Sequence, residues 1–166
     1  PTRPRPRLAL RSLRVAAATL ALALLAGSAH AADPMAESMF QQGIAMMREG
    51  RFEEARRALE ASQKLEAKSG TLLVLASCDE QLGRTATAWA SYKEAAALAR
   101  TEGRAEHVTK ATDLARNLEP RLSKIRIDTP TQGGVQLTVK LDGATVLDGA
   151  LGVAFAIDPG SHVVEA

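Results

Sequence analysis

Two histidines, one cysteine and two pairs of neighbouring carboxylates are the residues beyond position 31 that could carry chemistry. His107 falls on an expected helix and His162 follows a turn in PGSHVV, and neither has a cysteine or a second histidine at metal-site spacing. Glu53-Glu54 and Asp79-Glu80 are adjacent on expected helices, so the side chains of each pair point about 100° apart and do not converge. The sequence contains no G-x-S-x-G, phosphate-binding glycine loop or H-E-x-x-H. These features predict no catalytic, cofactor or metal site, and we expect a protein that is not an enzyme.

The single cysteine, Cys78, lies in the apolar stretch TLLVLASCDEQLG. One cysteine cannot form an internal disulfide, so the stability of the fold must come from packing. A free cysteine in apolar surroundings behaves as a small hydrophobic side chain. We therefore predict a buried, unreactive thiol rather than a redox centre.

Residues 1–31 have the layout of a secretory signal peptide. PTRPRPRLALRSLR carries five arginines and no acid, and an uncharged run follows from Val15 to Gly27. Ala29 and Ala31 then supply an A-x-A site, which predicts cleavage after Ala31 and export to the periplasm or cell envelope. The alternative is a membrane anchor, but the thirteen-residue run would rise only about 20 Å as a helix, against a hydrocarbon core of about 30 Å.

Removal of this segment changes the sign of the net charge. The whole chain has 21 basic and 19 acidic residues, and loss of the five N-terminal arginines leaves 16 basic against 19 acidic, a net charge of −3. The remaining chain has no basic stripe with interleaved aromatic residues. Nucleic acid is therefore not an expected partner.

From residue 32 to 122 the small and apolar residues recur at helical spacing in five segments. Turns are expected at Gly50, at KSG (68–70), at Gly83 and at TEG (101–103). The expected buried faces are Met35, Met39, Gly43, Met46 and Met47; Phe52, Ala55, Leu59, Ser62 and Leu65; Leu72, Leu73, Leu75, Ala76 and Leu82; Ala88, Tyr92, Ala95 and Leu98; and Val108, Ala111, Ala115, Leu118 and Leu122. Helix, short turn and helix in alternation predict helical hairpins.

Two hairpins are related by a shift of 33 residues, which places GRFEEARRALEASQKL on GRTATAWASYKEAAALA. A glycine between helices, then alanine, then a bulky residue resembles the tetratricopeptide repeat over about residues 36–102. The resemblance implies that the first helices contribute a small residue, here Gly43 and Ala76, although the aromatic residue before it and the closing proline are missing. The repeat-packing residues are Gly43, Gly50, Ala55, Leu59, Ala76, Gly83, Ala88, Tyr92 and Ala95. The fifth helix would then cap the stack, and the alternative is a plain five-helix bundle.

Tetratricopeptide repeats bind partners along the concave side, which the first helix of each hairpin lines. The resemblance implies that a candidate groove for a peptide or a partner helix contains Phe40, Ile44, Met47, Leu73, Ser77 and Glu80. The Lys/Asn set with which some members clamp a C-terminal carboxylate is absent. The alternative, that several of these residues belong to the core between helices, stays open because two repeats make a short groove.

After Leu122 the pattern changes to alternation, typical of strands. The runs SKIRID, VQLTVKLDG, ATVLDG, VAFAID and HVVEA are separated by turn sequences at Asp142-Gly143, Asp148-Gly149 and Asp158-Pro159-Gly160. In the second run, one face would hold Val135, Leu137, Val139 and Leu141. Residues 123–166 are therefore predicted to form an antiparallel β module, and the chain is predicted to be α+β.

The LDG turn followed by PGSHVV resembles the PEGA-type β module of bacterial cell-envelope proteins, over about residues 127–166. We expect this module to be cut short at Ala166, with an open strand edge near Val163 and Val164. The rival interpretation is a generic β-hairpin extension.

The combined pattern predicts an exported, non-enzymatic scaffold of the cell envelope that binds a protein through its helical repeats. The alternative is a sensory or cell-wall-binding module whose β part recognises a glycan for a membrane-associated complex. Glycan sites stack sugars on aromatic rings, and the β module has only Phe155, on its expected inner face. That observation favours the scaffold. A membrane-anchored or cell-wall-associated complex and self-association stay open as partners.

Overall fold

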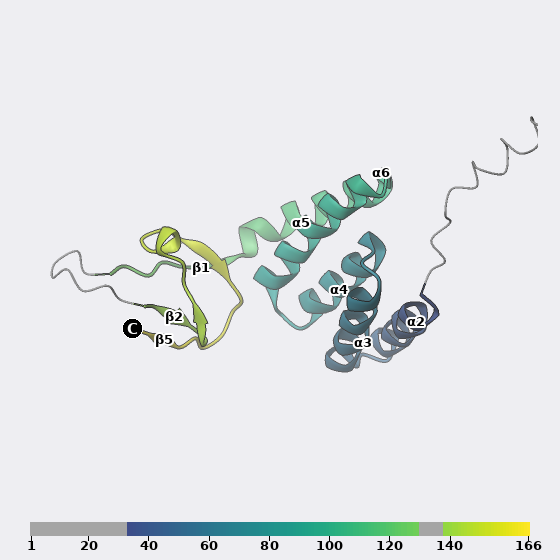
Figure 1. The fold of residues 1–166 in the computed structure, drawn as a ribbon, viewed down its shortest axis with the longest axis horizontal. Coiled ribbons are helices and arrows are strands. Elements are labelled where there is room, and N and C mark those ends of the chain that lie inside the picture. The colour runs from purple at the N-terminus through teal and green to yellow at the C-terminus, as the bar shows by residue number, and fades with distance from the viewer. Residues whose placement is uncertain (1–32, 130–137) are drawn as a thin grey trace, which may run out of the picture. The chain divides into compact units, whose positions relative to one another are not determined.

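The computed structural model describes residues 33–129 and 138–166 (Figure 1). The predicted signal peptide and the strand residues Val135 and Leu137 lie outside these ranges. Asp33–Ala166 form one compact unit, with helices first and a small antiparallel β part after them. The predicted α+β fold with helical hairpins is confirmed. Within the described ranges, no helix has the length and hydropathy needed to cross a membrane.

In the part of the chain that the structure describes, five α-helices pack in chain order. α2 packs on α3, α3 on α4, α4 on α5 and α5 on α6, while α4 also contacts α2 and α6. This pattern of neighbour and next-neighbour contacts is that of stacked helical hairpins rather than of a closed bundle. The bounds are α2 Pro34–Arg48, α3 Phe52–Leu65, α4 Ser69–Gln81, α5 Thr85–Thr101 and α6 Ala105–Leu118, followed by the short 3₁₀ helix η1 Glu119–Arg121.

Three helices end in the same glycine turn. Gly50, Gly83 and Gly103 have φ of +74°, +76° and +70°, a left-handed conformation that side chains disfavour. After α2, the N–H of Arg51 donates to the carbonyl of Met46 at 2.9 Å, which is the hydrogen bond of a Schellman motif. The same bond recurs after α4 and α5. Each of these glycines is followed by arginine, so the sequence Gly-Arg marks all three turns.

The turn expected at KSG (68–70) is wrong, because Ser69 and Gly70 already belong to α4. α3 ends at Leu65 without a glycine, and Lys68 is extended, with φ −133°. Leu65 was expected on the buried face, but it is 49% exposed because it is the last residue of its helix. Among the helices that the structure describes, the Schellman turn therefore occurs only at the three Gly-Arg sites.

The helical core is built from small residues that allow close approach of the helices. Gly43 lies against Leu59, and a Cβ at Gly43 would come within 2.6 Å of Leu59 Cγ. The other repeat-packing residues inside helices are all buried, with exposed fractions of 0–1%: Ala55, Leu59, Ala76, Ala88, Tyr92 and Ala95. Small and bulky residues therefore alternate across the helix contacts, as interdigitated packing requires.

The described residues of the β part form two small antiparallel sheets. β1 (Ser123–Ile125) pairs with β4 (Phe155–Ile157), with Ser123 opposite Ile157. The second sheet has the order β3-β2-β5, formed by Ala144–Thr145, Lys140–Leu141 and Val164–Glu165. Among the described strands β5 is therefore at the edge of its sheet, and its Val164 is 48% exposed.

The predicted hairpin turns have different outcomes. Asp142-Gly143 joins β2 to β3, and both residues have positive φ, +50° and +79°, as a type I′ turn requires. Asp148-Gly149 forms no hairpin but a 3₁₀ turn, η2 (Asp148–Ala150), and among the strands that the structure describes β3 pairs only with β2. Asp158-Pro159-Gly160 connects β4 to β5, which belong to different sheets, so the predicted hairpin is also wrong there.

Candidate functional site

The helices α2, α4 and α6 form the walls of a cleft of about 430 Å³. α4 contacts both α2 and α6, so it lies between the two outer walls. The residues that line the cleft are Ile44, Met47 and Arg48 of α2, Leu73, Val74, Ser77 and Glu80 of α4, Tyr92 of α5, and Lys110 and Leu114 of α6. We call this cavity the α2/α4/α6 cleft.

Five of the six predicted groove residues lie together in the α2/α4/α6 cleft: Ile44, Met47, Leu73, Ser77 and Glu80. The sixth, Phe40, lines a separate pocket, because it stands one helical turn before Ile44 on α2. Leu73 is only 7% exposed, so it serves both the cleft and the helical core. For Leu73, the predicted groove position and the alternative core position therefore both apply.

Of the charged residues that line the cleft, Glu80 has an ion-pair partner, whereas Arg48 and Lys110 have none in the described ranges. Glu80 accepts a hydrogen bond from Arg121 Nη1 at 2.7 Å and lies 3.5 Å from the Tyr92 hydroxyl. Burial raises the pKa of Tyr92 to about 12, so this hydroxyl stays protonated at neutral pH. Arg48 and Lys110 are exposed, on opposite walls, and form no ion pair with any residue in the described ranges. The cleft thus offers an aliphatic surface and two available positive charges.

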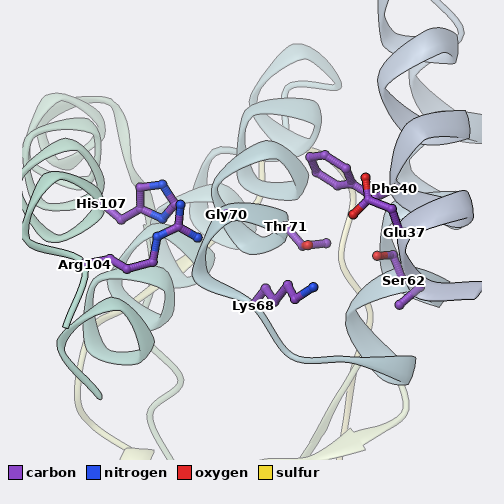
Figure 2. A pocket seen from close by; sticks show the side chains of 9 residues that line it. Glu37, Phe40, Ser62, Lys68, Gly70, Thr71, Arg104 and His107 are labelled. Carbon is purple, nitrogen blue, oxygen red and sulfur yellow. The ribbon is translucent and has the colours of Figure 1, made fainter. Parts of the chain in front are cut away.

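The second pocket, of about 420 Å³, lies near the start of α4 (Figure 2). Lys68, Arg104 and His107 line it, together with Glu37, Phe40, Ser62 and Thr71. Its positive charge is offset, because Lys68 Nζ is 2.8 Å from Glu66 and Glu37 lines the same pocket. The adjacent start of α4 is also occupied, since Glu102 accepts the Ser69 N–H at 2.9 Å. Two of the groups near this pocket that could bind an anion, Lys68 and the Ser69 N–H, are therefore already bound to carboxylates.

Ser69 lies within hydrogen-bond distance of both His107 and Glu102, which invites comparison with a catalytic triad. In a triad the histidine lies between the serine and the carboxylate. Here the serine is in the middle: its Oγ is 2.8 Å from His107 Nδ1 and also donates to Glu102. Ser69 is fully buried, so its hydroxyl cannot attack a substrate. The cluster fixes the start of α4.

The same capping arrangement occurs in both hairpins. The Glu66 carboxylate accepts the N–H of Asp33 at 3.1 Å, and the Glu102 carboxylate accepts that of Ser69 at 2.9 Å. Both contacts span 33 residues, from the end of the second helix to the start of the first. Each glutamate satisfies a backbone donor that a helix start leaves unpaired. In each hairpin this contact joins the end of the second helix to the start of the first helix.

A buried ion pair joins the two hairpins. Asp79 on α4 is 1% exposed, and its Oδ1 lies 2.7 Å from Arg56 Nε on α3. Burial raises the pKa of Asp79, while the hydrogen bond from Arg56 opposes that shift. The neighbouring Cys78 is fully buried, its Sγ donates to the carbonyl of Phe52 at 3.1 Å, and burial raises its pKa to about 11. These groups are structural.

Four residues that line the cleft were not predicted from the sequence: Arg48, Val74, Lys110 and Leu114. Lys110 and Leu114 were missed because the fifth helix was treated only as a cap. A signal was present, since α6 begins at Ala105, about one repeat length after the start of α4 at Ser69. Within the described ranges, no group of three or more histidine, cysteine, aspartate or glutamate residues is arranged to hold a metal ion.

No protein-family model matches this sequence, and no curated protein matches it. Among solved structures, the type III secretion translocator chaperone SycD of Yersinia enterocolitica is similar over 55% of this chain and 83% of its own, with 19% sequence identity and a TM-score of 0.37. The helical hairpins described above are established by the contacts within this chain and not by that likeness.

Proposed function

We propose that this chain is a non-enzymatic protein-binding module, and that the α2/α4/α6 cleft holds a partner segment with an aliphatic side chain between acidic residues. One observation carries the proposal. The cleft has an aliphatic wall, and the two lining charges without an ion pair in the described ranges, Arg48 and Lys110, are both positive. An acidic partner would complement both charges, and its aliphatic side chain would be buried between them.

A peptide segment suits this cleft better than a small molecule. Small-molecule sites fix their ligand with several converging polar groups. The central polar group here, Glu80, already binds Arg121, while Arg48 and Lys110 stand on opposite walls. Charges placed apart on two helices match side chains spaced along a chain that crosses the cleft. Met47 adds an adaptable surface, because an unbranched thioether packs against different partner side chains.

For the cellular location, we propose export to the periplasm or cell envelope, with the β part acting as a PEGA-like positioning module. Support comes from the basic, apolar and A-x-A layout of residues 1–31 and from the LDG and PGSHVV sequences. Expression with residues 1–31 attached, followed by N-terminal sequencing of periplasmic material, should give a chain that begins at Ala32. An intact arginine-rich N-terminus in the membrane fraction would refute export by cleavage.

The binding proposal can be tested by selecting peptides from a random display library on the purified, immobilised chain. We expect enriched peptides with a leucine, isoleucine or methionine flanked by aspartate or glutamate, binding with Kd on the order of 1–100 μM. Affinity should fall as salt rises, because exposed charges are screened. Peptides without acidic residues would contradict the proposed chemistry.

Charge reversal gives the matched test. Arg48→Glu with Lys110→Glu should weaken binding of the selected acidic peptide by at least 10-fold and leave the unfolding midpoint nearly unchanged, since both residues are exposed. The control is Arg57→Glu with Lys93→Glu, two exposed residues that do not line the cleft. Equal losses in both double variants would show attraction by net charge alone and would refute the site.

A further inference from the structure

α5 begins without a cap from its own sequence. Its N-cap residue, Arg84, provides no side-chain hydrogen bond. The cap comes instead from Asp158, in the loop after β4. Asp158 Oδ1 accepts the N–H groups of Ala86 and Thr87 at 2.7 and 2.9 Å, and its Oδ2 accepts the Thr87 hydroxyl at 2.6 Å. A carboxylate is favoured at this position, because it satisfies unpaired backbone donors and meets the positive end of the helix dipole.

The capping loop is in turn held by His162. Its Nε2 is 2.7 Å from the backbone carbonyl oxygen of Asp158, and its Nδ1 is 2.6 Å from Asp142 Oδ2 in the β2–β3 turn. The other oxygen of Asp142 accepts the N–H of Val163 at 2.9 Å. One imidazole therefore connects the β2–β3 turn to the loop that caps α5.

Both ring nitrogens of His162 face oxygen atoms that can only accept. A carbonyl oxygen and an ionised carboxylate have no proton to donate, so each nitrogen must carry one. Only the imidazolium form has two N–H groups. The charged groups that act on His162 are the carboxylates of Asp142 and Asp158, both negative. The hydrogen bond to Asp142 raises the pKa of His162, and the same bond lowers the pKa of Asp142.

We propose that protonation of His162 is a switch that fastens the Asp158 loop, and with it the cap of α5, to the β part of the chain. When the ring loses a proton, the charge-assisted bond from Nδ1 to Asp142 is the stronger one and is kept. Nε2 then presents a lone pair to the Asp158 carbonyl oxygen, and this contact becomes repulsive. Release of the loop weakens the cap on Ala86 and Thr87.

The direction of the pH effect follows from the shift. The pKa of His162 in the folded chain lies above its ordinary value of 6.5. The contribution of His162 to the stability of the fold is therefore complete below pH 6.5 and is lost as pH rises through the folded pKa. Asp142 has a folded pKa below 3.8, so its contribution is complete above 3.8 and is lost as pH falls through the folded value. Both His162 hydrogen bonds are therefore formed between the folded pKa of Asp142 and the folded pKa of His162. The bond to the Asp158 carbonyl is lost when the pH rises above the folded pKa of His162.

Nuclear magnetic resonance on the whole chain tests the switch. The imidazole nitrogens of His162 should titrate with a midpoint above 6.5, and both should carry protons below it. Across that midpoint, hydrogen-exchange protection of the Ala86 and Thr87 amides, corrected for the intrinsic pH dependence, should fall at least threefold. Protection of Ala96, deeper in α5, should stay constant. A midpoint at or below 6.5, or unchanged protection of Ala86 and Thr87, would overturn the proposal.

Two histidine variants separate the switch from general effects of pH. His162→Gln should show low, pH-independent protection of Ala86 and Thr87, while His107→Gln should keep the wild-type pH dependence. If the dependence persists in His162→Gln, the proposal is wrong. The titration of wild-type His162 decides the matter even if that variant does not fold. Neither readout involves the α2/α4/α6 cleft, so the outcome is independent of the proposed function.

Discussion

Gly43 on α2 and Leu59 on α3 are so close that a Cβ at position 43 would force the Leu59 side chain to shift. A Cβ at Gly43 would lie 2.6 Å from Leu59 Cγ and 2.8 Å from Leu59 Cδ2. Leu59 is fully buried in the helical core, so a shift of its side chain would disturb the residues packed around it. This contact sets the separation of the first two helices and hence the position of the α2 wall of the cleft.

Gly43→Ala should therefore destabilise the chain, although alanine is the better helix former by about 1 kcal/mol. We expect a net loss of about 1–3 kcal/mol from overpacking, measured by urea unfolding. In a Leu59→Ala background the space is free, and the same substitution should be neutral or stabilising. A stabilised Gly43→Ala in the wild-type background would show that the helices separate at little cost.

The helical hairpins could be predicted from sequence because helical periodicity and the Gly-Arg turns are local signals. Gly50 and Gly83 need a left-handed backbone, and that need is visible in the residue itself. The small side chain of Ala88 likewise predicts a close contact between helices, and Ala88 is fully buried. Such features depend on neighbours within one or two turns.

Contacts between distant residues could not be predicted in the same way. Nothing near Asp158 indicates that it caps a helix 71 residues earlier, and nothing near Glu102 indicates its bond to Ser69. The turn at KSG was misassigned for this reason, because the cap that lets Ser69 start a helix comes from another part of the chain. The repeat register predicted five of the residues that line the cleft, whereas Lys110 was not predicted because the register was not extended to α6.

Removal of the Glu102 carboxylate, which caps the start of α4, should lower the stability of the chain. Glu102→Ala leaves the buried Ser69 N–H without its acceptor, and loss of such a cap costs about 0.5–2 kcal/mol. Urea unfolding should show this loss, together with faster hydrogen exchange of the Ser69 amide. Glu94→Ala, at an exposed position of α5, is the control and should change stability by less than about 0.5 kcal/mol. Equal stability of the two variants would refute the capping role.

Arg56→Met should destabilise the chain at neutral pH by roughly 3 kcal/mol, because it leaves the Asp79 carboxylate buried without its nearest partner. Burial holds the pKa of Asp79 above 3.8, and loss of Arg56 raises it further. A protonated Asp79 needs no counter-charge. The loss of stability of Arg56→Met relative to wild type should therefore shrink as pH falls through the raised pKa of Asp79 in the variant. Arg57→Met, at an exposed position, is the control. A deficit independent of pH would mean that lost packing, and not the ion pair, is responsible.

Cys78 should react slowly with an aromatic disulfide reagent at pH 8. Burial raises its pKa from 9.0 to about 11, which alone lowers the thiolate fraction about 100-fold. The reaction should accelerate by at least that factor when urea unfolds the chain. Equal rates in native buffer and in urea would show that the thiol is accessible in the folded chain.

The most direct test of the binding module is a methyl nuclear magnetic resonance titration of the whole chain with a selected acidic peptide. We expect shift changes in the methyl groups of four residues that line three walls of the cleft, Ile44, Leu73, Val74 and Leu114. No change is expected at the exposed Val163 and Val164 of the β part. Saturating changes confined to the β part, with the four cleft residues unaffected, would contradict the proposed function.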